Sequence, residues 1–424
     1  MRIGLESPFS KRLLLGAAVV LASAYGILAA FQCIAYFLAD HAARRTLRLA
    51  VRMDPGNADY RNRLGHYYDF VARDPSAALH WYQSAARLNP HNAKYWLDVA
   101  NTYQVMGDQA AQTSAVEQAV LMDPTMPEVA WQAANLYLVQ GETEKALHQF
   151  HVVLQSGDPS YIAMVMQMCW RVSPNVDVLL RDVLPGTTDS YLFFLSQLMS
   201  KGQIEDTVKV WDALISLHQP FAIQRVFDYI QYLLTHKEVD QASLVWKQAM
   251  SLLSLGAYLA SSHNLIVNPD FSLNVLNGGF DWRYRTETAV SLTLDSSNFH
   301  SGHRSLSIVF DGPGVEDAGI YQLIPVLPST TYEFSGYYKN DEIEGAGGLY
   351  LVLQDAYTRT TYFQSEELRE GEFWKIVTGE LKTGPDTKLL ILRVQRLPSG
   401  RPIRGKLWID DFRLAEKQPP GGEP

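Results

Sequence analysis

The hydrophobic pattern changes character along the chain, and its first element is a long apolar run. Residues 13–39 carry no charged side chain and directly follow Lys11 and Arg12. About 20 apolar residues span a bilayer as a helix, so this run is long enough to cross a membrane. A cleaved signal peptide is the competing interpretation, but its apolar core usually covers only about 7 to 15 residues. The pattern favours an uncleaved transmembrane helix over residues 13–39, after a short tail at residues 1–12.

The charges that flank this run leave its orientation open. The basic residues near its two ends are Arg2, Lys11, Arg12, Arg44, Arg45, Arg48 and Arg52. They nearly balance across the run, so the positive-inside rule does not choose a side. No glycine or proline separates Leu38 from Arg52, which favours a membrane helix that continues into the next helix. A break at Asp40 and His41 is the alternative.

The next part of the chain repeats itself. Prolines recur at nearly equal intervals, each after an aspartate or asparagine, at Pro55, Pro90, Pro124 and Pro159. A period of about 34 residues is typical of a repeated pair of antiparallel helices, because each pair exposes an apolar face that the next pair covers. The spacing predicts an α-solenoid over residues 41–254. Such solenoids present long surfaces to other macromolecules.

The residues between the prolines narrow this prediction. The unit that ends at Pro124 contains Trp96, Val99, Ala100, Tyr103, Gly107 and Ala119, and the next contains Ala133, Ala134, Tyr137, Gly141, Ala146 and Phe150. Small residues in this order allow two helices to pack closely. The order resembles the tetratricopeptide repeat family over about residues 58–159. Two weaker units follow, and the short segment 160–185 is expected to interrupt the stack.

The resemblance implies a protein or peptide partner on the first helices of the repeats. The polar positions that would line such a groove include Asn62, His66, Lys94, Asn101, Gln104 and Asn135. Solvent exposure without any partner explains each of these residues equally well. Lys94 is the one basic residue among them, so a clamp of lysines and arginines for a chaperone's C-terminal carboxylate is not expected.

The period changes from helical to alternating near residue 264. Residues 255–263 read as a linker. Short β-rich runs bounded by Gly, Pro, Asp and Ser then follow at residues 305–310, 331–339, 348–354, 374–381, 388–395 and 406–414. This pattern predicts a β-sandwich of the jelly-roll type over residues 264–416. The Pro- and Gly-rich residues 417–424 are expected to form a disordered tail.

Local motifs in this β-rich part support a closer comparison. They are Asn264-Leu-Ile-Val-Asn-Pro-Asp-Phe271, Gly279-Phe-Asp-Trp282, Ser301-Gly-His-Arg-Ser-Leu306, Tyr321-Gln322 and Leu407-Trp-Ile-Asp-Asp-Phe-Arg-Leu414. Together they resemble the galactose-binding-like fold of carbohydrate-binding modules of families four and nine. The resemblance implies a jelly roll and a glycan ligand, although many such domains bind no sugar. It also implies a structural calcium ion, held here by Asp270 and Asp410, although Ser272 replaces an acidic residue that is common in the family.

Sugar recognition needs an aromatic ring for stacking and planar polar groups that read hydroxyls. Strand alternation places Tyr337 and Lys339 opposite Phe334 and Tyr338. By the same rule Arg393 shares a face with Gln395. Our candidate glycan site consists of Trp282, Tyr337, Gln354, Arg393 and Gln395. The alternative is that these aromatic residues are core residues and that the polar ones form an ordinary solvated sheet face.

Composition and charge exclude several other classes. The net charge of −9 and the interspersed acidic and basic residues argue against a nucleic-acid partner. The two cysteines, Cys33 and Cys169, cannot build a disulfide framework or a cysteine-based zinc site. Neighbouring acids such as Glu366 and Glu367 point to opposite faces of a strand and cannot flank one glycosidic bond. We therefore expect no catalytic residues and no enzymatic activity.

These expectations combine into one hypothesis. The chain would be a multi-domain protein with a single transmembrane helix, an all-α tetratricopeptide-like solenoid and an all-β sandwich. It would lie in a bacterial inner membrane, with its C-terminal domains on the periplasmic side. It would act as a scaffold that binds protein partners and possibly glycan, in exopolysaccharide or envelope assembly. The alternatives are a pure protein adaptor with a structural sandwich and an envelope enzyme with accessory repeats.

Overall fold

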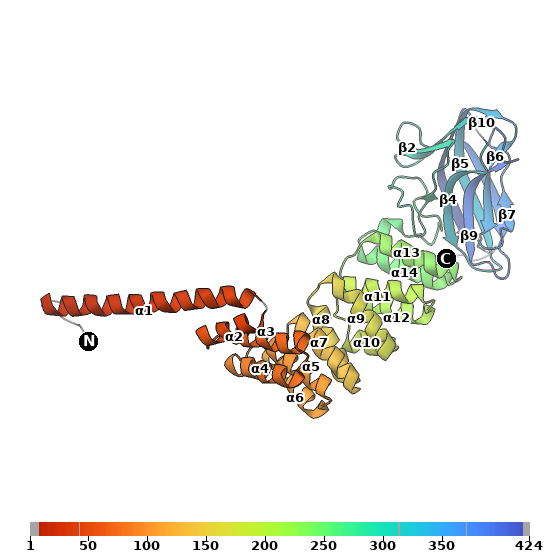
Figure 1. Cartoon of the computed structure of the whole chain (residues 1–424). Helices are drawn as coiled ribbons and strands as arrows, with labels where there is room; N and C mark the ends of the chain where they lie inside the picture. The colour runs from red at the N-terminus through yellow and green to blue at the C-terminus, as the bar shows by residue number, and fades with distance from the viewer. Residues whose placement is uncertain (1–7, 42, 313, 370, 419–424) are drawn as a thin grey trace. The chain divides into compact units, whose positions relative to one another are not determined.

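The computed structural model describes residues 8–41, 43–312, 314–369 and 371–418 (Figure 1). Much of the two predicted tails, at residues 1–7 and 419–424, lies outside the described residues. The chain divides into two compact units, Met1–Pro185 and Gly186–Pro424. The order of elements confirms the predicted fold class: a long apolar helix, a series of helical hairpins and two antiparallel sheets.

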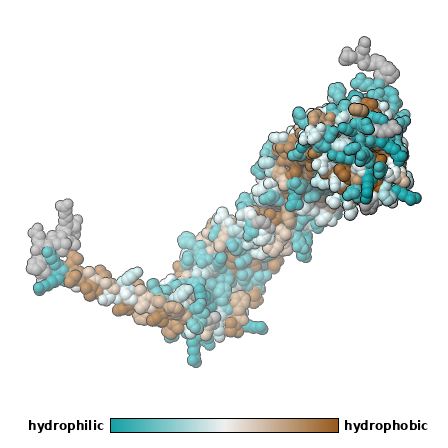
Figure 2. Space-filling model, turned by 90° about the horizontal axis from the view of Figure 1, so that it is seen from above, coloured by the Kyte–Doolittle hydropathy of each residue, from teal (hydrophilic) through white to brown (hydrophobic). Residues whose placement is uncertain are grey.

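The first unit begins with helix α1, Pro8–Asp40. Within the described residues one helix is long and apolar enough to cross a membrane, at Lys11–Asp40, and Figure 2 shows apolar side chains along it. A signal sequence passes the same test of length and composition. Helix α2, Arg44–Met53, starts only after a break, with Ala43 in an extended conformation. The prediction of a continuous helix is therefore wrong, and the alternative break after Asp40 is the one observed.

Antiparallel hairpins follow in the first unit, as the repeat predicted. Their helices are α3 Ala58–His66, which continues as a π-turn at Tyr67–Val71, α4 Pro75–Leu88, α5 Ala93–Met106, α6 Gln109–Met122, α7 Pro127–Gln140, α8 Thr143–Gln155, α9 Pro159–Val172 and α10 Val176–Asp182. Asparagine and aspartate side chains cap several helix starts; the Asn92 side chain, for example, accepts a hydrogen bond from the Lys94 N–H. Gly107 and Gly141 end α5 and α7 in the left-handed conformation, which glycine adopts without steric cost.

The prolines of the repeat have two different roles. Pro55, Pro90 and Pro124 directly follow the C-caps Asp54, Asn89 and Asp123 of α2, α4 and α6. A residue before proline is disfavoured in helical conformation, so each pair ends the second helix of its unit. Pro159 instead lies in the first turn of α9, behind the N-cap Asp158. The hairpin that follows is short, because α10 is only 7 residues long.

The second unit starts with two further hairpins. Their helices are α11 Thr188–Ser200, α12 Ile204–Ser216, α13 Ile223–Thr235 and α14 Val239–Leu252, and a 3₁₀ turn follows at Gly256–Tyr258. Trp211 and Tyr229 are fully buried in the core between these helices, with ring centroids 5.3 Å apart. Large buried rings at repeat-like positions explain why this part keeps the helical period although its signature residues are few.

Two five-stranded antiparallel sheets complete the second unit. The strands are β1 Arg283–Tyr284, β2 Val290–Asp295, β3 Ser305–Gly312, β4 Asp317–Pro325, β5 Thr331–Gly345, β6 Gly348–Asp355, β7 Thr361–Gln364, β8 Lys375–Lys382, β9 Leu389–Leu397 and β10 Ile403–Glu416. The first sheet has the order β1-β4-β9-β6-β7 and the second sheet the order β2-β3-β10-β5-β8. Alternate residues of both sheets point inward and form one apolar core, as expected for a sandwich.

Within this unit the last helical pair packs against the sandwich. The Trp246 indole of α14 donates to the Tyr258 carbonyl at 3.0 Å, and its ring lies edge-on to Phe280 with centroids 6.1 Å apart. Gly279 has a positive φ of 59°, and a Cβ at this position would overlap the Trp246 ring. Only glycine both adopts this positive φ without strain and leaves room for the Trp246 ring. The linker predicted at residues 255–263 thus includes the ordered, buried ring of Tyr258.

The same contact region buries a carboxylate. The Asp281 side chain is fully inaccessible; its Oδ2 accepts the Leu276 N–H at 2.6 Å, whereas its Oδ1 has no partner among the described residues. Burial disfavours the charged form and raises the Asp281 pKa to about 7. The folded protein therefore retains a proton that the unfolded chain releases near pH 4, so this group makes the fold less stable as the pH rises from 4 to 7.

We predict that Asp281→Asn removes much of this pH dependence. Between pH 5 and pH 7.5 the free energy of unfolding of the wild type should fall by about 2 kcal/mol on account of Asp281. The buried Asp410, whose pKa is raised to about 6, adds a change of the same sign that the variant keeps. Urea unfolding at the two pH values measures the difference. Asp311→Asn, at a side chain that is 86% exposed, is the control, and an unchanged slope in Asp281→Asn would contradict the assignment.

Candidate functional site

A cavity of about 300 Å³ opens on the outer face of the first sheet. Its polar lining comes from β1, β4, β6, β9, the loops after β1 and β6, and helix α13, all within the second unit. These lining residues include Gln231, Arg283, Arg285, Asp317, Tyr321, Gln354, Arg359 and Arg393. The site therefore combines residues that are far apart in the sequence.

Strand alternation explains why these side chains face outward. In β9 the neighbours Leu392 and Val394 are buried in the sandwich core, so Arg393 between them points to the opposite face. The register then places Arg393 opposite Tyr321 of β4 on one side and opposite Val352 of β6 on the other. Three adjacent strands thus present an aromatic, a cationic and an apolar side chain in one row.

Arg393 and Gln354 are joined directly. The Arg393 Nη2 donates to the Gln354 Oε1 at 2.6 Å, and the Gln354 Nε2 donates to the Thr361 hydroxyl at 2.9 Å. The Arg393 Nε is buried and has no hydrogen-bond partner among the described residues. An unsatisfied buried donor costs free energy unless a water molecule or a ligand accepts it. The Arg393 guanidinium group in the cavity wall therefore has an N–H group, at Nε, that is available to a water molecule or a ligand.

A single carboxylate, Asp317, balances two guanidinium groups of the cavity. Its Oδ1 accepts from the Arg285 Nη2 at 2.7 Å, and its Oδ2 lies 3.5 Å from the Arg393 Nη1. The Arg285 Nε also donates to Glu287 at 2.6 Å, and these partners raise the Arg285 pKa, Glu287 most of all. The guanidinium groups are thereby held in fixed orientations.

Helix α13 takes part in the site through Gln231. The Arg283 Nη1 donates to the Gln231 Oε1 at 2.7 Å, and the Arg283 Nε donates to the Gly279 carbonyl at 3.0 Å. Burial lowers the Arg283 pKa, and the contact with Tyr321 only partly opposes that shift. The contact between α13 and β1 thus positions one of the cations that line the cavity.

The structure separates the predicted glycan site. Gln354 and Arg393 meet in the cavity, and Gln395 lies on the same face, opposite Tyr350 of β6. Trp282 is instead a core residue that is 1% exposed; its ring stacks on Phe271 with centroids 4.9 Å apart. Its indole N–H donates to the Asn268 carbonyl, which fixes the ring inside the sandwich. Trp282 therefore offers no surface for stacking, as the alternative interpretation had it.

Tyr337 lies on the other sheet. As predicted, it points away from Phe334 and Tyr338, but it belongs to β5 of the second sheet and so cannot join Gln354 and Arg393. The His300 ring stacks on Tyr337 with centroids 3.6 Å apart, and the His300 Nδ1 lies 3.0 Å from Asp411. A neighbouring ring thus already covers one face of Tyr337.

Sequence reasoning missed most of the cavity. Gln231, Arg283, Arg285, Asp317 and Arg359 were not considered, and Tyr321 was noted only as part of a family motif. Alternation indicates which face a residue takes, but the strand order that brings β1, β4, β9 and β6 together is a property of the fold. The available signal was the recurrence of arginines in the strands and in the loops that follow them, at Arg283, Arg285, Arg359 and Arg393.

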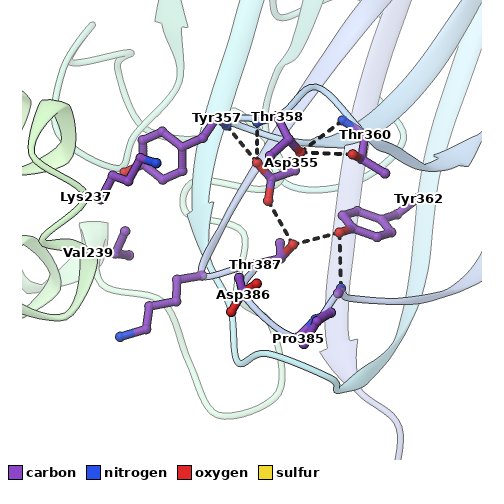
Figure 3. Close-up of a pocket in the computed structure, with 12 residues that line it drawn as sticks. Lys237, Val239, Asp355, Tyr357, Thr358, Thr360, Tyr362, Pro385, Asp386 and Thr387 are labelled. Atoms are coloured by element: carbon purple, nitrogen blue, oxygen red, sulfur yellow. Dashed lines mark hydrogen bonds between the residues drawn. The ribbon is translucent and has the colours of Figure 1, made fainter.

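A second cavity, of about 320 Å³, lies near Lys237, Asp355 and Thr387 (Figure 3). Asp355 accepts from the Tyr357 N–H at 2.8 Å, the Thr358 N–H at 2.7 Å and the Thr387 hydroxyl at 2.8 Å. Burial tends to raise its pKa, but these hydrogen bonds outweigh burial and hold the Asp355 pKa below its ordinary value. Because the carboxylate is satisfied internally, we assign this network to the fold rather than to a ligand.

The carboxylates implied for calcium already have hydrogen-bond donors. The buried Asp410 accepts from the backbone N–H groups of His300, Ser301 and Asp411, and Asp270 accepts from the Ser272 N–H and hydroxyl. The described residues contain no group of three His, Cys, Asp or Glu side chains suited to a metal. Calcium takes six to eight oxygen ligands. Both carboxylates are thus bonded within the fold, and a calcium ion at Asp270 and Asp410 stays a prediction.

In the first unit, some of the predicted groove residues have polar partners within the fold, and the others are exposed to solvent. The Asn62 Nδ2 donates to Asp98 at 2.7 Å, and the His66 Nε2 lies 3.5 Å from the same carboxylate. Burial raises the Asp98 pKa, and Asn62 and His66 oppose that shift. The Asn135 Nδ2 donates to the Trp131 carbonyl within its own helix. The side chains that remain exposed are Lys94, Asn101 and Gln104.

Asp98 of this cluster was not predicted, although the repeat carried a signal for it. Asn62 and Asp98 are 36 residues apart, so they occupy nearly equivalent places in consecutive units. Side chains at equivalent places on neighbouring repeats lie side by side along a solenoid. The pair therefore links two repeats on the surface that was predicted to be a groove.

Comparisons with solved structures found similarity to each kind of domain. A CBM4 carbohydrate-binding module is 18% identical, with a TM-score of 0.28, over 36% of this chain and 99% of that chain. A xylan-binding domain from Paenibacillus barcinonensis is 15% identical, with a TM-score of 0.25, over 35% of this chain and 92% of that chain. A tetratricopeptide-repeat protein from Thermus thermophilus is 23% identical, with a TM-score of 0.26, over 30% of this chain and 70% of that chain.

A search of the curated proteins found no match. A scan against protein-family models found one for the β-rich part of the chain, described as a carbohydrate binding domain, over residues 263–400. This agrees with the resemblance drawn from the sequence motifs of the sandwich. It covers β1 to β9, including the cavity residues Arg283, Tyr321, Gln354 and Arg393. Residues 263–400 of the chain therefore match the carbohydrate binding domain family.

Proposed function

We propose that the protein is a membrane-anchored scaffold that binds glycan through the cavity on the first sheet and a protein partner through its repeats. The observation that supports it best is the cavity itself, where the planar groups of Arg393 and Gln354 lie beside the Tyr321 ring. Guanidinium and amide groups can form paired hydrogen bonds with sugar hydroxyls, and a phenol ring can stack on a sugar face. The family match of this region is consistent with that role.

We further propose that the protein binds and does not catalyse. Among the residues that line the cavity, Asp317 is the single carboxylate, and two arginines engage it. Glycoside hydrolysis needs two carboxyl groups on opposite sides of the bond, one of them free to give up a proton. Both oxygens of Asp317 are already engaged, Oδ1 by the Arg285 guanidinium and the Gly319 N–H and Oδ2 by Arg393, so neither is free to act on a glycosidic bond. An envelope enzyme with accessory repeats is therefore the weakest of the three hypotheses.

The repeats would supply the scaffold role. In the first unit, Lys94, Asn101 and Gln104 lie exposed on α5, next to the Asn62–Asp98 pair that spans two repeats. This surface suits a polar peptide rather than an apolar helix. A pure adaptor with a structural sandwich is the rival, and it predicts a protein partner without any glycan affinity.

For the location we propose a bacterial inner membrane, with the solenoid and the sandwich on the periplasmic side, in exopolysaccharide or envelope assembly. The support is the apolar helix α1 together with a glycan-binding domain, whose ligand would be found outside the cytoplasm. Protease added to spheroplasts should then degrade the C-terminal domains while intact cells protect them. Protection in spheroplasts, with digestion only after lysis, would contradict the orientation.

The glycan site itself can be tested with two tyrosines. We predict that Tyr321→Ala weakens glycan binding by the full-length protein in detergent about tenfold, because a stacking contact is lost. Tyr337→Ala, on the second sheet, is the matched control and should bind like the wild type. Affinity electrophoresis in gels that contain soluble polysaccharides gives both values, and thermal melting shows that each variant is folded. A loss in Tyr337→Ala but not in Tyr321→Ala would contradict the assignment of the cavity.

A further inference from the structure

The charge of the cavity differs from that of the whole chain. The chain has a net charge of −9, yet the cavity is lined by Arg283, Arg285, Arg359 and Arg393 against the single carboxylate Asp317. A cavity with low-dielectric walls concentrates the field of the charges that line it. This part of the sandwich therefore attracts anions although the protein as a whole repels them.

Internal pairing does not neutralise these cations. Asp317 contacts Arg285 and Arg393, and Glu287 contacts Arg285 a second time. The partners of Arg283 among the described residues are uncharged: the Gln231 amide, the Gly279 carbonyl and the Tyr321 phenol. Two carboxylates thus face four guanidinium groups, which leaves a surplus of positive charge.

Arg359 contributes much of this unbalanced positive charge. It lies in the loop between β6 and β7, is exposed, and its side chain forms no ion pair among the described residues. Its backbone has a positive φ of 60°, and its N–H donates to the Asp355 carbonyl at 3.0 Å. The tight turn thus places an exposed guanidinium group at the cavity that Arg393 also lines.

The cavity is poor in the feature that neutral glycans require. Tyr321 is the single aromatic ring among its lining residues, because Trp282 lies in the core. Neutral sugars depend on stacking for much of their affinity. Charge-assisted hydrogen bonds from guanidinium to carboxylate are about twice as strong as neutral ones and are often bidentate. The chemistry of the cavity thus favours a ligand that carries a carboxylate.

We propose that the cavity selects acidic polysaccharides and binds the carboxylate of a uronic acid residue with Arg359 and Arg393. This rests on the proposed glycan function and names its substrate class. Gln354 and Tyr321 would contact the hydroxyls and the ring of the same sugar. The bound carboxylate would offset part of the positive charge that Asp317 and Glu287 leave unbalanced.

The test compares acidic oligosaccharides with their own methyl esters. Full-length protein in detergent is titrated by calorimetry with oligomers of galacturonic, glucuronic and mannuronic acid, each as the acid and as the uncharged ester. We expect at least one acid to bind about tenfold more tightly than its ester, with an affinity that falls as sodium chloride rises. Arg359→Gln should remove most of this preference for the acid over its ester.

The control is Arg404→Gln, at an arginine of the same sandwich whose side chain is 76% exposed, and it should keep the preference for acids. Thermal melting shows whether both variants remain folded. If esters or neutral oligosaccharides bind as tightly as the acids, the inference is wrong while the glycan function stands. If no oligosaccharide of either kind binds, the proposed function itself fails.

Discussion

The candidate site depends on one close contact, that of the Trp246 ring with the backbone of Gly279. Gly279 has no Cβ and a positive φ, so the indole can lie directly on the turn that leads into β1. The same turn offers the Gly279 carbonyl to Arg283, whose other partner is Gln231 of α13. Because of this contact, the last helical repeat and the first sheet share one cavity.

This arrangement ties the last helical pair to the cavity. In a solenoid each unit contacts its neighbours, so a shift at one end can pass along the stack only through packed units. In the second unit, α13 both packs in the repeats and contributes Gln231 to the cavity. A ligand that engages Arg283 or Gln231 thereby touches the last helical pair.

The sequence predicted the helices and strands better than the contacts between them. The uncharged run, the spaced prolines and the alternating strands indicated α1, the hairpins and the sandwich, because each is a local pattern of one period. The break at Ala43 was open, since propensity around Asp40 and His41 allowed either outcome. In the site, alternation correctly put Arg393 and Gln395 on one face. It could not show that Trp282 packs on Phe271, or that Tyr337 belongs to the other sheet, because both depend on strand order.

Hydrogen–deuterium exchange of the full-length protein, with and without a saturating acidic oligosaccharide, tests the central claim most directly. The account predicts slower exchange in three places at once: the segment after β1 at residues 283–287, the loop at residues 356–361 and helix α13. The first two carry Arg285 and Arg359, and the third carries Gln231. Protection confined to β5 and β8 around Tyr337, or no protection in the presence of measurable binding, would contradict it.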